Sequence, residues 1–289
     1  MRAVVVLLLL AAFSANADSP RPELPPPMSI EELREHDFDS ELVFERPLDD
    51  GESFSAYLVS YEHAGLTLHA MVAVPEGDMP DDGFPIVIAN HGYVPEPRNY
   101  GITGEGVDAR PGDYYRAVPE LFASRGFIVV MPDYRGHNSS EGYEYTQLPV
   151  DRAIEYYAED VVSLMAALDG LEDADLERVF MWSHSMGGPV SLRALLATDI
   201  VRAASFWSTM STESLDAYIH EFDVPIIIQH QIGDPTTPVE NSQRFAQSRR
   251  TPGVPRLLSL TSGEDHFFTG TKRAEAANKD AEYFRSHAD

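Results

Sequence analysis

The stretch Val179–Pro189, VFMWSHSMGGP, is an apolar run that ends in a serine between histidine and methionine, with two glycines directly behind it. Such a run predicts a buried strand, a sharp turn and a helix. On that turn the Ser185 backbone is strained and its hydroxyl is exposed, as in a nucleophile; alternatively, Ser185 only caps the helix. The small neighbours that the turn needs are Ser183 and Gly187, so S-H-S-M-G stands where G-x-S-x-G is usual.

Further apolar runs of the same kind predict the fold class. They are nearly continuous rather than alternating, which is typical of parallel strands that are covered on both faces. Segments with helical spacing fall between them, so the pattern predicts a doubly wound α/β sheet. The strands are expected at residues 85–90, 127–132, 178–183, 203–208, 225–230 and 256–261, and the clearest helices at 154–168 and 189–196.

An alternating pattern precedes these runs. Residues 53–63 and 66–75 alternate apolar and polar side chains on either side of Ala64-Gly65. Two such runs around a short turn predict a β-hairpin. The sheet is therefore expected to be mostly parallel, with an antiparallel hairpin at its N-terminal side.

The N-terminal residues have the features of export and linker sequence. A basic start at Arg2, an apolar run and the small residues 15–17 predict a signal peptide over residues 1–17. The run is shorter than the roughly 20 residues of a membrane span. Prolines predict an extended tether over 18–41, which leaves 42–289 as the catalytic domain. The protein is thus expected in a periplasm or outside the cell.

The charge of the chain limits the kinds of molecule that it is expected to bind. The chain has 47 Asp and Glu against 21 Lys and Arg, a formal net charge of −26. Nucleic acids and anionic membranes are not expected as partners, because both bind clustered basic side chains. The acidity fits solubility or life in salty water. The absence of cysteine from the sequence excludes disulfides, and without an H-E-x-x-H pattern neither a metal nor another cofactor is expected.

A serine nucleophile needs a base and a carboxylate that orients the base. Asp234 lies four residues beyond the strand at 225–230, in a Gly/Pro/Thr loop, and His266 lies five residues beyond the strand at 256–261. With Ser185 they give the order Ser, Asp, His. Asp223 precedes its strand and belongs at the wrong edge, and Asp265 is expected to be solvated. The alternative for Asp234 is a turn-forming aspartate.

The reaction also needs hydrogen-bond donors for the developing oxyanion. The backbone amide of Met186, directly after the serine, is one candidate. The loop after the strand at 85–90 begins His91-Gly92-Tyr93, and the Tyr93 amide is the second candidate. His91 is expected to be structural, since it falls at the end of the strand.

Besides the serine turn, three motifs of the chain resemble those of a known family. They are HGY (91–93), PDYRGHNSS (132–140) and HQIGDPTTPVENS (230–242). With them the chain, from about Phe54 onward, resembles the α/β-hydrolase superfamily. Within it the likeness is to prolyl oligopeptidase catalytic domains and dienelactone-hydrolase-like relatives. The resemblance implies the α/β-hydrolase fold, with Asp234 and His266 as acid and base.

Several positions depart from the family pattern. Gln231 and Asn138 replace glycines, and Thr237 stands where valine is usual. Asp133 and Arg135 lie in the DYRG stretch, which is usually structural in the family that the chain resembles, and they are expected to form a buried ion pair rather than to react.

The expected activity is hydrolysis of carboxylic esters through an acyl-enzyme. A peptidase acting on short peptides is the first alternative, and a non-catalytic binding module on the same scaffold is the second. Neither a propeller nor a large lid is expected, since the segment 209–222 is short. The loops 94–112 and 137–152, with the residues directly after the first, contain tyrosines that either grip a substrate or pack the loops. These tyrosines are Tyr100, Tyr114, Tyr115, Tyr143 and Tyr145.

Overall fold

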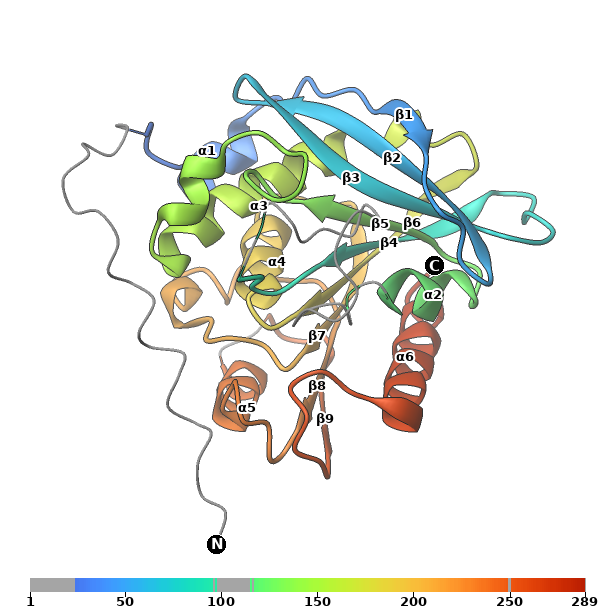
Figure 1. Cartoon of the computed structure of the whole chain (residues 1–289). Coiled ribbons are helices and arrows are strands. Elements are labelled where there is room, and N and C mark those ends of the chain that lie inside the picture. The colour runs from blue at the N-terminus through green and yellow to red at the C-terminus, as the bar shows by residue number, and fades with distance from the viewer. Residues whose placement is uncertain (1–23, 96, 98–114, 116, 249–250, 289) are drawn as a thin grey trace, which may run out of the picture.

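The structure, a computed structural model, describes residues 24–95, 97, 115, 117–248 and 251–288 (Figure 1). The predicted signal peptide and the loop residues Tyr100 and Tyr114 lie outside this part of the chain. Within it, no helix has the length and the hydropathy that a bilayer span requires.

A mixed sheet forms the centre of the molecule (Figure 1). The strand order is β1-β2-β3-β5-β4-β6-β7-β8-β9, and from β5 to β9 every neighbouring pair is parallel. The predicted mostly parallel sheet with an antiparallel N-terminal hairpin is confirmed. The strands are β1 (Val43–Pro47), β2 (Phe54–His63), β3 (Leu66–Pro75), β4 (Phe84–Asn90), β5 (Ile128–Asp133), β6 (Ala174–His184), β7 (Val201–Trp207), β8 (Ile226–Gln231) and β9 (Arg256–Thr261).

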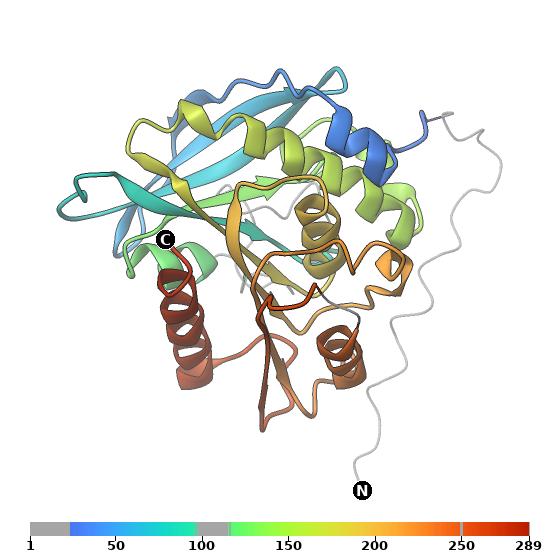
Figure 2. The same cartoon turned by 180° about the vertical axis from the view of Figure 1, so that it is seen from behind.

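Helices cover both faces of the sheet (Figures 1 and 2). One apolar core lies beneath α1, α3, α4 and α5, and a second lies beneath α2 and α6. Every residue of β5 and of β8 is buried, as expected for strands that are covered on both faces. β5 is apolar up to Pro132, whereas β8 continues from three isoleucines into Gln229, His230 and Gln231. The helices are α1 (Ile30–Glu35), α2 (Val118–Ala123), α3 (Val150–Ala166), α4 (Gly187–Leu195), α5 (Val239–Gln247) and α6 (Gly270–Arg285), with short 3₁₀ turns η3 (Tyr143–Gln147), η4 (Leu168–Gly170) and η5 (Glu213–Leu215).

The hairpin of β2 and β3 closes through a two-residue turn. Ala64 and Gly65 both have positive φ, 51° and 75°, as the twist of a tight hairpin requires. The register pairs His63 with Leu66 and continues without a break to Phe54 and Pro75. This is the hairpin that the alternating pattern predicts.

The packed part of the chain starts earlier than the predicted boundary at residue 42. Ile30 and Leu33 of α1 are 1% exposed and reach the core. Ser29 and Glu32 form a capping box, which gives this short helix a defined start. The preceding segment is bound to α3, since the Tyr156 hydroxyl donates to the carbonyl of Pro25 at 2.6 Å. From residue 24 onward the predicted tether is therefore part of the fold.

The expected ion pair between Asp133 and Arg135 is wrong, because Arg135 finds its partners on α3. Its guanidinium lies 2.6 Å from Asp160 and 3.1 Å from Glu159, and all three side chains are nearly fully buried. Asp133 instead accepts a hydrogen bond from the Asn138 amide at 3.2 Å. Asn138 has a φ of 46°, so it adopts the left-handed conformation that a glycine would also take.

Candidate active site

The predicted catalytic residues follow three strands of the parallel part of the sheet. Ser185 comes directly after β6, Asp234 follows β8 and His266 follows β9. The carboxyl ends of parallel strands meet at one edge, which is where open α/β sheets bind their ligands. The structure brings all three residues to this edge.

The turn at Ser185 has the strained backbone that the sequence predicts, but the side chain is not exposed as expected, since the residue is 6% exposed. Ser185 has a φ of 55°, in the left-handed region that non-glycine residues rarely adopt. Its amide donates to the carbonyl of Trp207 at 3.0 Å, which fixes the turn against β7. A Cβ on Gly187 would overlap the carbonyl of Asn90, so the crowded turn requires glycine there.

Ser183 takes the first small position of this turn without disturbing it. The residue is 1% exposed, and its hydroxyl donates to the carbonyl of Ser205 on β7 at 3.2 Å. The departure from glycine is therefore accommodated by a hydrogen bond to the neighbouring strand, which satisfies the buried hydroxyl.

Asp234 and His266 form a direct hydrogen bond. The Asp234 Oδ2 lies 2.8 Å from the His266 Nδ1, and the aspartate side chain is fully buried while the imidazole is 16% exposed. Burial alone would raise the pKa of the Asp234 carboxyl, but hydrogen bonds from His230 and His266 hold that pKa well below its ordinary value. The carboxylate is therefore charged and able to orient the imidazole with its Nε2 free to take a proton.

Two further residues support Asp234, and sequence reasoning assigned neither of them a role. The Thr237 hydroxyl lies 2.9 Å from Oδ2, and the His230 Nε2 lies 3.3 Å from the same oxygen. His230 is held in turn, because its Nδ1 is 2.6 Å from the Ser242 hydroxyl and its Nε2 is 3.1 Å from the carbonyl of Thr237. The signal in the sequence is the H-x-x-x-D spacing of His230 and Asp234.

The two expected oxyanion donors flank the serine turn. Met186 is the residue before α4, and Tyr93 follows Gly92 in the loop after β4. A Cβ on Gly92 would lie 2.9 Å from the Ser185 Cβ, so the two loops are in close contact. Within the described residues neither the Met186 nor the Tyr93 amide donates a hydrogen bond to another group of the protein.

The Ser185 hydroxyl makes no hydrogen bond to His266 in this structure, although both residues lie in its described part. His184, the residue before Ser185, contacts His266, with 4.5 Å between the ring centroids. Catalytic hydrogen bonds of this type often form only when a substrate is bound.

The tyrosines of the loops near the candidate site differ in their exposure to solvent. Tyr145 is buried and packs on the guanidinium of Arg135 at 4.8 Å. Tyr143 is 38% exposed, and Tyr115 is buried beside His184. Of these three, only Tyr143 is placed to face solvent.

No cluster of three or more His, Asp or Glu side chains with metal-binding geometry occurs in the part of the chain that the structure describes.

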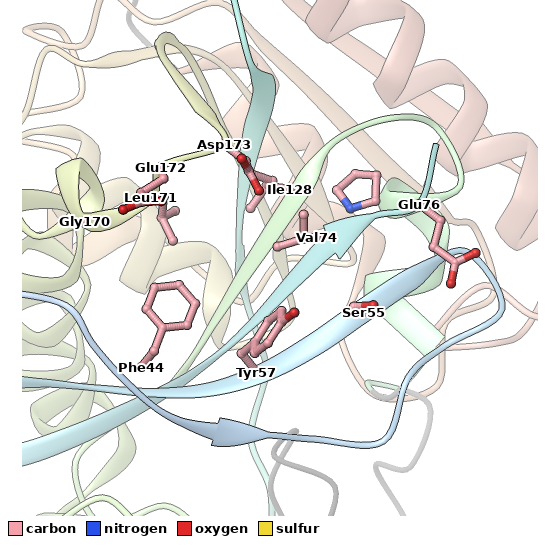
Figure 3. Close-up of a pocket in the computed structure, with 11 residues that line it drawn as sticks. Phe44, Ser55, Tyr57, Val74, Glu76, Ile128, Gly170, Leu171, Glu172 and Asp173 are labelled. Atoms are coloured by element: carbon pink, nitrogen blue, oxygen red, sulfur yellow. The ribbon is translucent and has the colours of Figure 1, made fainter. Parts of the chain in front are cut away.

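A cavity of about 490 Å³ lies away from the candidate site, at the amino ends of the parallel strands (Figure 3). Phe44 and Tyr57 line it with an aromatic pair, and Glu172 and Asp173 approach it from the loop before β6.

Replacing Thr237 with valine tests whether the Thr237 hydroxyl stabilises the Asp234 carboxylate. The change removes the hydroxyl that lies 2.9 Å from Oδ2 but keeps the shape of the side chain. We expect kcat to fall by about three- to tenfold, because one of the hydrogen bonds to a charged group is lost while others remain. Steady-state hydrolysis measures this, with Thr236→Val as the control, since its exposed side chain makes no such contact. A kcat equal to wild type would contradict the expected role of the hydroxyl.

Comparisons with known proteins agree with the architecture. Residues 99–204 match a family model described as the alpha/beta hydrolase fold. No curated protein matches the sequence significantly. Among solved structures, the acylaminoacyl peptidase of Pyrococcus horikoshii is similar with a TM-score of 0.64 and 18% identity, over 82% of this chain and 42% of that one.

Two smaller enzymes match over most of both chains. The acetyl xylan esterase of Paenibacillus sp. R4 has a TM-score of 0.61 and 16% identity, over 88% of this chain and 92% of that one. Est1E of Butyrivibrio proteoclasticus, solved with ferulic acid bound, has a TM-score of 0.58 and 16% identity, over 79% and 98%. At these identities the likeness establishes the α/β-hydrolase fold, and the fold alone does not select an activity.

Proposed function

We propose that this chain, which has the fold of the α/β hydrolases, is an exported serine hydrolase that cleaves carboxylic esters through an acyl-enzyme intermediate. The observation behind the proposal is the meeting of two features at one edge of the sheet. One is a serine in a left-handed turn, and the other is a buried aspartate 2.8 Å from a histidine. Structural roles alone would not need both.

In the proposed reaction the Ser185 Oγ attacks the ester carbonyl carbon as His266 Nε2 takes the hydroxyl proton. The carbonyl oxygen becomes an oxyanion, which accepts hydrogen bonds from the Met186 and Tyr93 amides. When the tetrahedral intermediate collapses, the bond to the leaving alcohol oxygen breaks and His266 returns the proton to it. Water then attacks the acyl-enzyme in the same way, releasing the carboxylic acid and restoring Ser185.

Asp234 stays charged throughout these steps. Its lowered pKa keeps it a carboxylate over the range in which a histidine base works. It fixes the imidazole as the Nδ1–H tautomer and stabilises the imidazolium that forms after the proton transfer. No metal or organic cofactor enters any step.

We prefer an ester to a peptide as substrate because the similar esterases match this chain over more of their own length than the similar peptidase does. The acetyl xylan esterase and Est1E match over nearly their whole length, whereas the acylaminoacyl peptidase matches over 42% of its chain. The peptidase likeness, which has the higher TM-score, keeps hydrolysis of short peptides as the second candidate. A non-catalytic binding module is the least favoured reading, since it would not need the Asp234–His266 pair.

Export and the choice of partner belong to the same proposal. The pattern at residues 1–17 supports a signal peptide, and the net charge of −26 disfavours nucleic acid and anionic membrane surfaces. The partner is therefore a small ester or a short peptide. Cell fractionation with detection of an N-terminus at Asp18 tests the export of the chain.

The activity is tested with a panel of p-nitrophenyl acetate and butyrate beside aminoacyl- and prolyl-p-nitroanilides. We expect turnover of the esters and labelling of Ser185 by a fluorophosphonate, with the adduct located by peptide mass spectrometry. Ser183→Ala is the matched control, because it removes a neighbouring serine and should leave both results unchanged. Anilide cleavage at a comparable kcat/KM would make the protein a peptidase, and labelling of neither wild type nor control would overturn the proposal.

A further inference from the structure

Two buried side chains outside the predicted triad, Tyr115 and His184, lie directly beside it. Tyr115 is 3% exposed and His184 is fully buried. His184 is the residue before Ser185, and its ring contacts the ring of His266. The aromatic ring of Tyr115 packs at 5.5 Å from that of His184, measured between centroids. The mechanism above uses neither side chain.

The hydrogen bonds of His184 have a defined direction. Its Nε2 lies 3.0 Å from the carbonyl oxygen of His266, and a carbonyl can only accept, so Nε2 must carry a proton. Burial, with repulsion from His266 added, holds the pKa of His184 well below its ordinary value, so the ring carries one proton. The Nδ1 atom is therefore an acceptor, and the Tyr115 hydroxyl, 2.6 Å away, donates to it.

The same hydroxyl accepts a hydrogen bond from the opposite side. The amide of Gly92 donates to the Tyr115 oxygen at 2.7 Å. Gly92 precedes Tyr93, whose amide is the expected oxyanion donor. A Cβ on Gly92 would overlap the Tyr115 hydroxyl, so glycine is what allows this contact. The hydrogen bonds thus run in one direction, from the Gly92 amide through Tyr115 and His184 to the carbonyl of His266.

We propose that Tyr115 and His184 are positioning residues for the hydrolysis reaction. Their hydrogen bonds join the loop of the oxyanion donor Tyr93 to the loop of the base His266, and Ser185 directly follows His184. Hydrogen bonds in a buried chain polarise and orient one another, so breaking one link weakens the connection between the two loops. This inference rests on the proposed function, because it assigns these residues to that reaction.

The hydrogen-bond partners of Tyr115 and His184 explain why a tyrosine and a histidine occupy these positions. Imidazole supplies one donor and one acceptor on opposite sides of a rigid ring, and that is what a link between a hydroxyl and a carbonyl requires. A phenol hydroxyl both accepts and donates, as the position between the Gly92 amide and the His184 Nδ1 demands. Phenylalanine at either position would keep the packing and lose the chain.

The test compares kcat and KM for p-nitrophenyl butyrate in Tyr115→Phe, His184→Phe and the double variant. We expect each single variant to lower kcat by about ten- to a hundredfold with little change in KM, since reacting groups are displaced rather than removed. The double variant should be no slower than the slower single variant, because both changes break one chain. His184→Gln, which restores a donor and an acceptor, should recover part of the lost kcat.

Tyr156→Phe is the matched control. It also removes one tyrosine hydrogen bond, the one to the Pro25 carbonyl, but on α3 and away from the site. It should lower the melting temperature as Tyr115→Phe does and leave kcat unchanged. Wild-type kcat in Tyr115→Phe, or additive losses in the double variant, would overturn this inference while leaving the proposed function intact. A wild-type protein that neither hydrolyses esters nor takes the fluorophosphonate label would overturn both.

Discussion

Replacing Asp234 with asparagine is expected to lower kcat for ester hydrolysis by about 10⁴-fold while KM and the fold stay close to wild type. The reason lies in the hydrogen bonds of the carboxylate. Its Oδ1 accepts the amides of Thr236 and Thr237 at 2.8 and 3.0 Å. An asparagine must therefore place its carbonyl oxygen there, and its NH₂ group then takes the place of Oδ2.

That NH₂ group would face the Nδ1 of His266. Two donors cannot share a hydrogen bond, so the imidazole must move its proton from Nδ1 to Nε2. The Nε2 atom then no longer accepts the Ser185 proton, and the base is lost although every side chain remains in place. The loss should appear in kcat rather than in KM.

Steady-state kinetics of Asp234→Asn beside Asp265→Asn measure this effect. Asp265 is the carboxylate next to His266 in sequence, and its side chain is exposed and accepts only from Thr269 in the described structure. Its asparagine variant should stay within about twofold of wild type, as expected for an exposed charge. If Asp265→Asn lost activity and Asp234→Asn kept it, the carboxylate of the triad would be wrongly assigned.

Replacing Arg135 with methionine is expected to lower the free energy of unfolding by about 3–5 kcal/mol. Methionine fills much of the space but leaves the carboxylates of Asp160 and Glu159 buried without their cationic partner. Removing one member of a buried ion pair is costly because the other charge remains out of water. Urea unfolding at neutral pH measures the change.

The pH dependence of this loss has a definite sign. Burial raises the pKa of Asp160 above its ordinary value even with Arg135 present, and without Arg135 the shift becomes larger. A raised pKa means that the folded state keeps a proton which the unfolded state releases, so stability from this group is lost as the pH rises. The deficit of Arg135→Met should therefore be smaller at pH 5 than at pH 8.

Arg202→Met is the surface counterpart. Arg202 pairs with Glu177 at 3.1 Å, but both side chains are largely in solvent. Its loss should be below about 1 kcal/mol and nearly independent of pH over the same range. Equal losses for the buried and the exposed pair would contradict the importance of the cluster around Arg135.

The central strands of the sheet could be predicted because they are buried on both faces, and such burial produces continuous apolar runs in the sequence. The strand β9 was predicted from a similar run, although Arg256 is its only buried residue. The sequence of β1 has no such apolar run and did not predict a strand, since all five of its residues are exposed and one is a proline.

The helix α1 did have a signal, the capping box of Ser29 and Glu32, but the prolines before it favoured an extended tether. Short amphipathic elements are decided by their tertiary contacts. Here Arg34 of α1 donates to the carbonyl of Leu196 at the end of α4, and the Met28 amide, just before α1, donates to Glu159 of α3.

The candidate site, too, could be predicted from the sequence only in part. Ser185, Asp234 and His266 could be named because each follows a recognisable strand, and their catalytic roles stay predictions. The partners Tyr115 and His184 are 69 residues apart in the chain, and their contact depends on how Tyr115 packs against the carboxyl end of β6. The partners of Arg135 likewise come from α3, so proximity in sequence suggested Asp133 instead.

The left-handed backbone of Ser185 has a consequence for how this protein can change. A side chain in that conformation costs on the order of 1 kcal/mol, which glycine would avoid. Glycine at 185 would thus make the fold more robust and abolish the proposed chemistry in one step. Selection for heat resistance alone would favour that inactive sequence, so a thermostabilised lineage keeps its nucleophile only while activity is selected alongside stability.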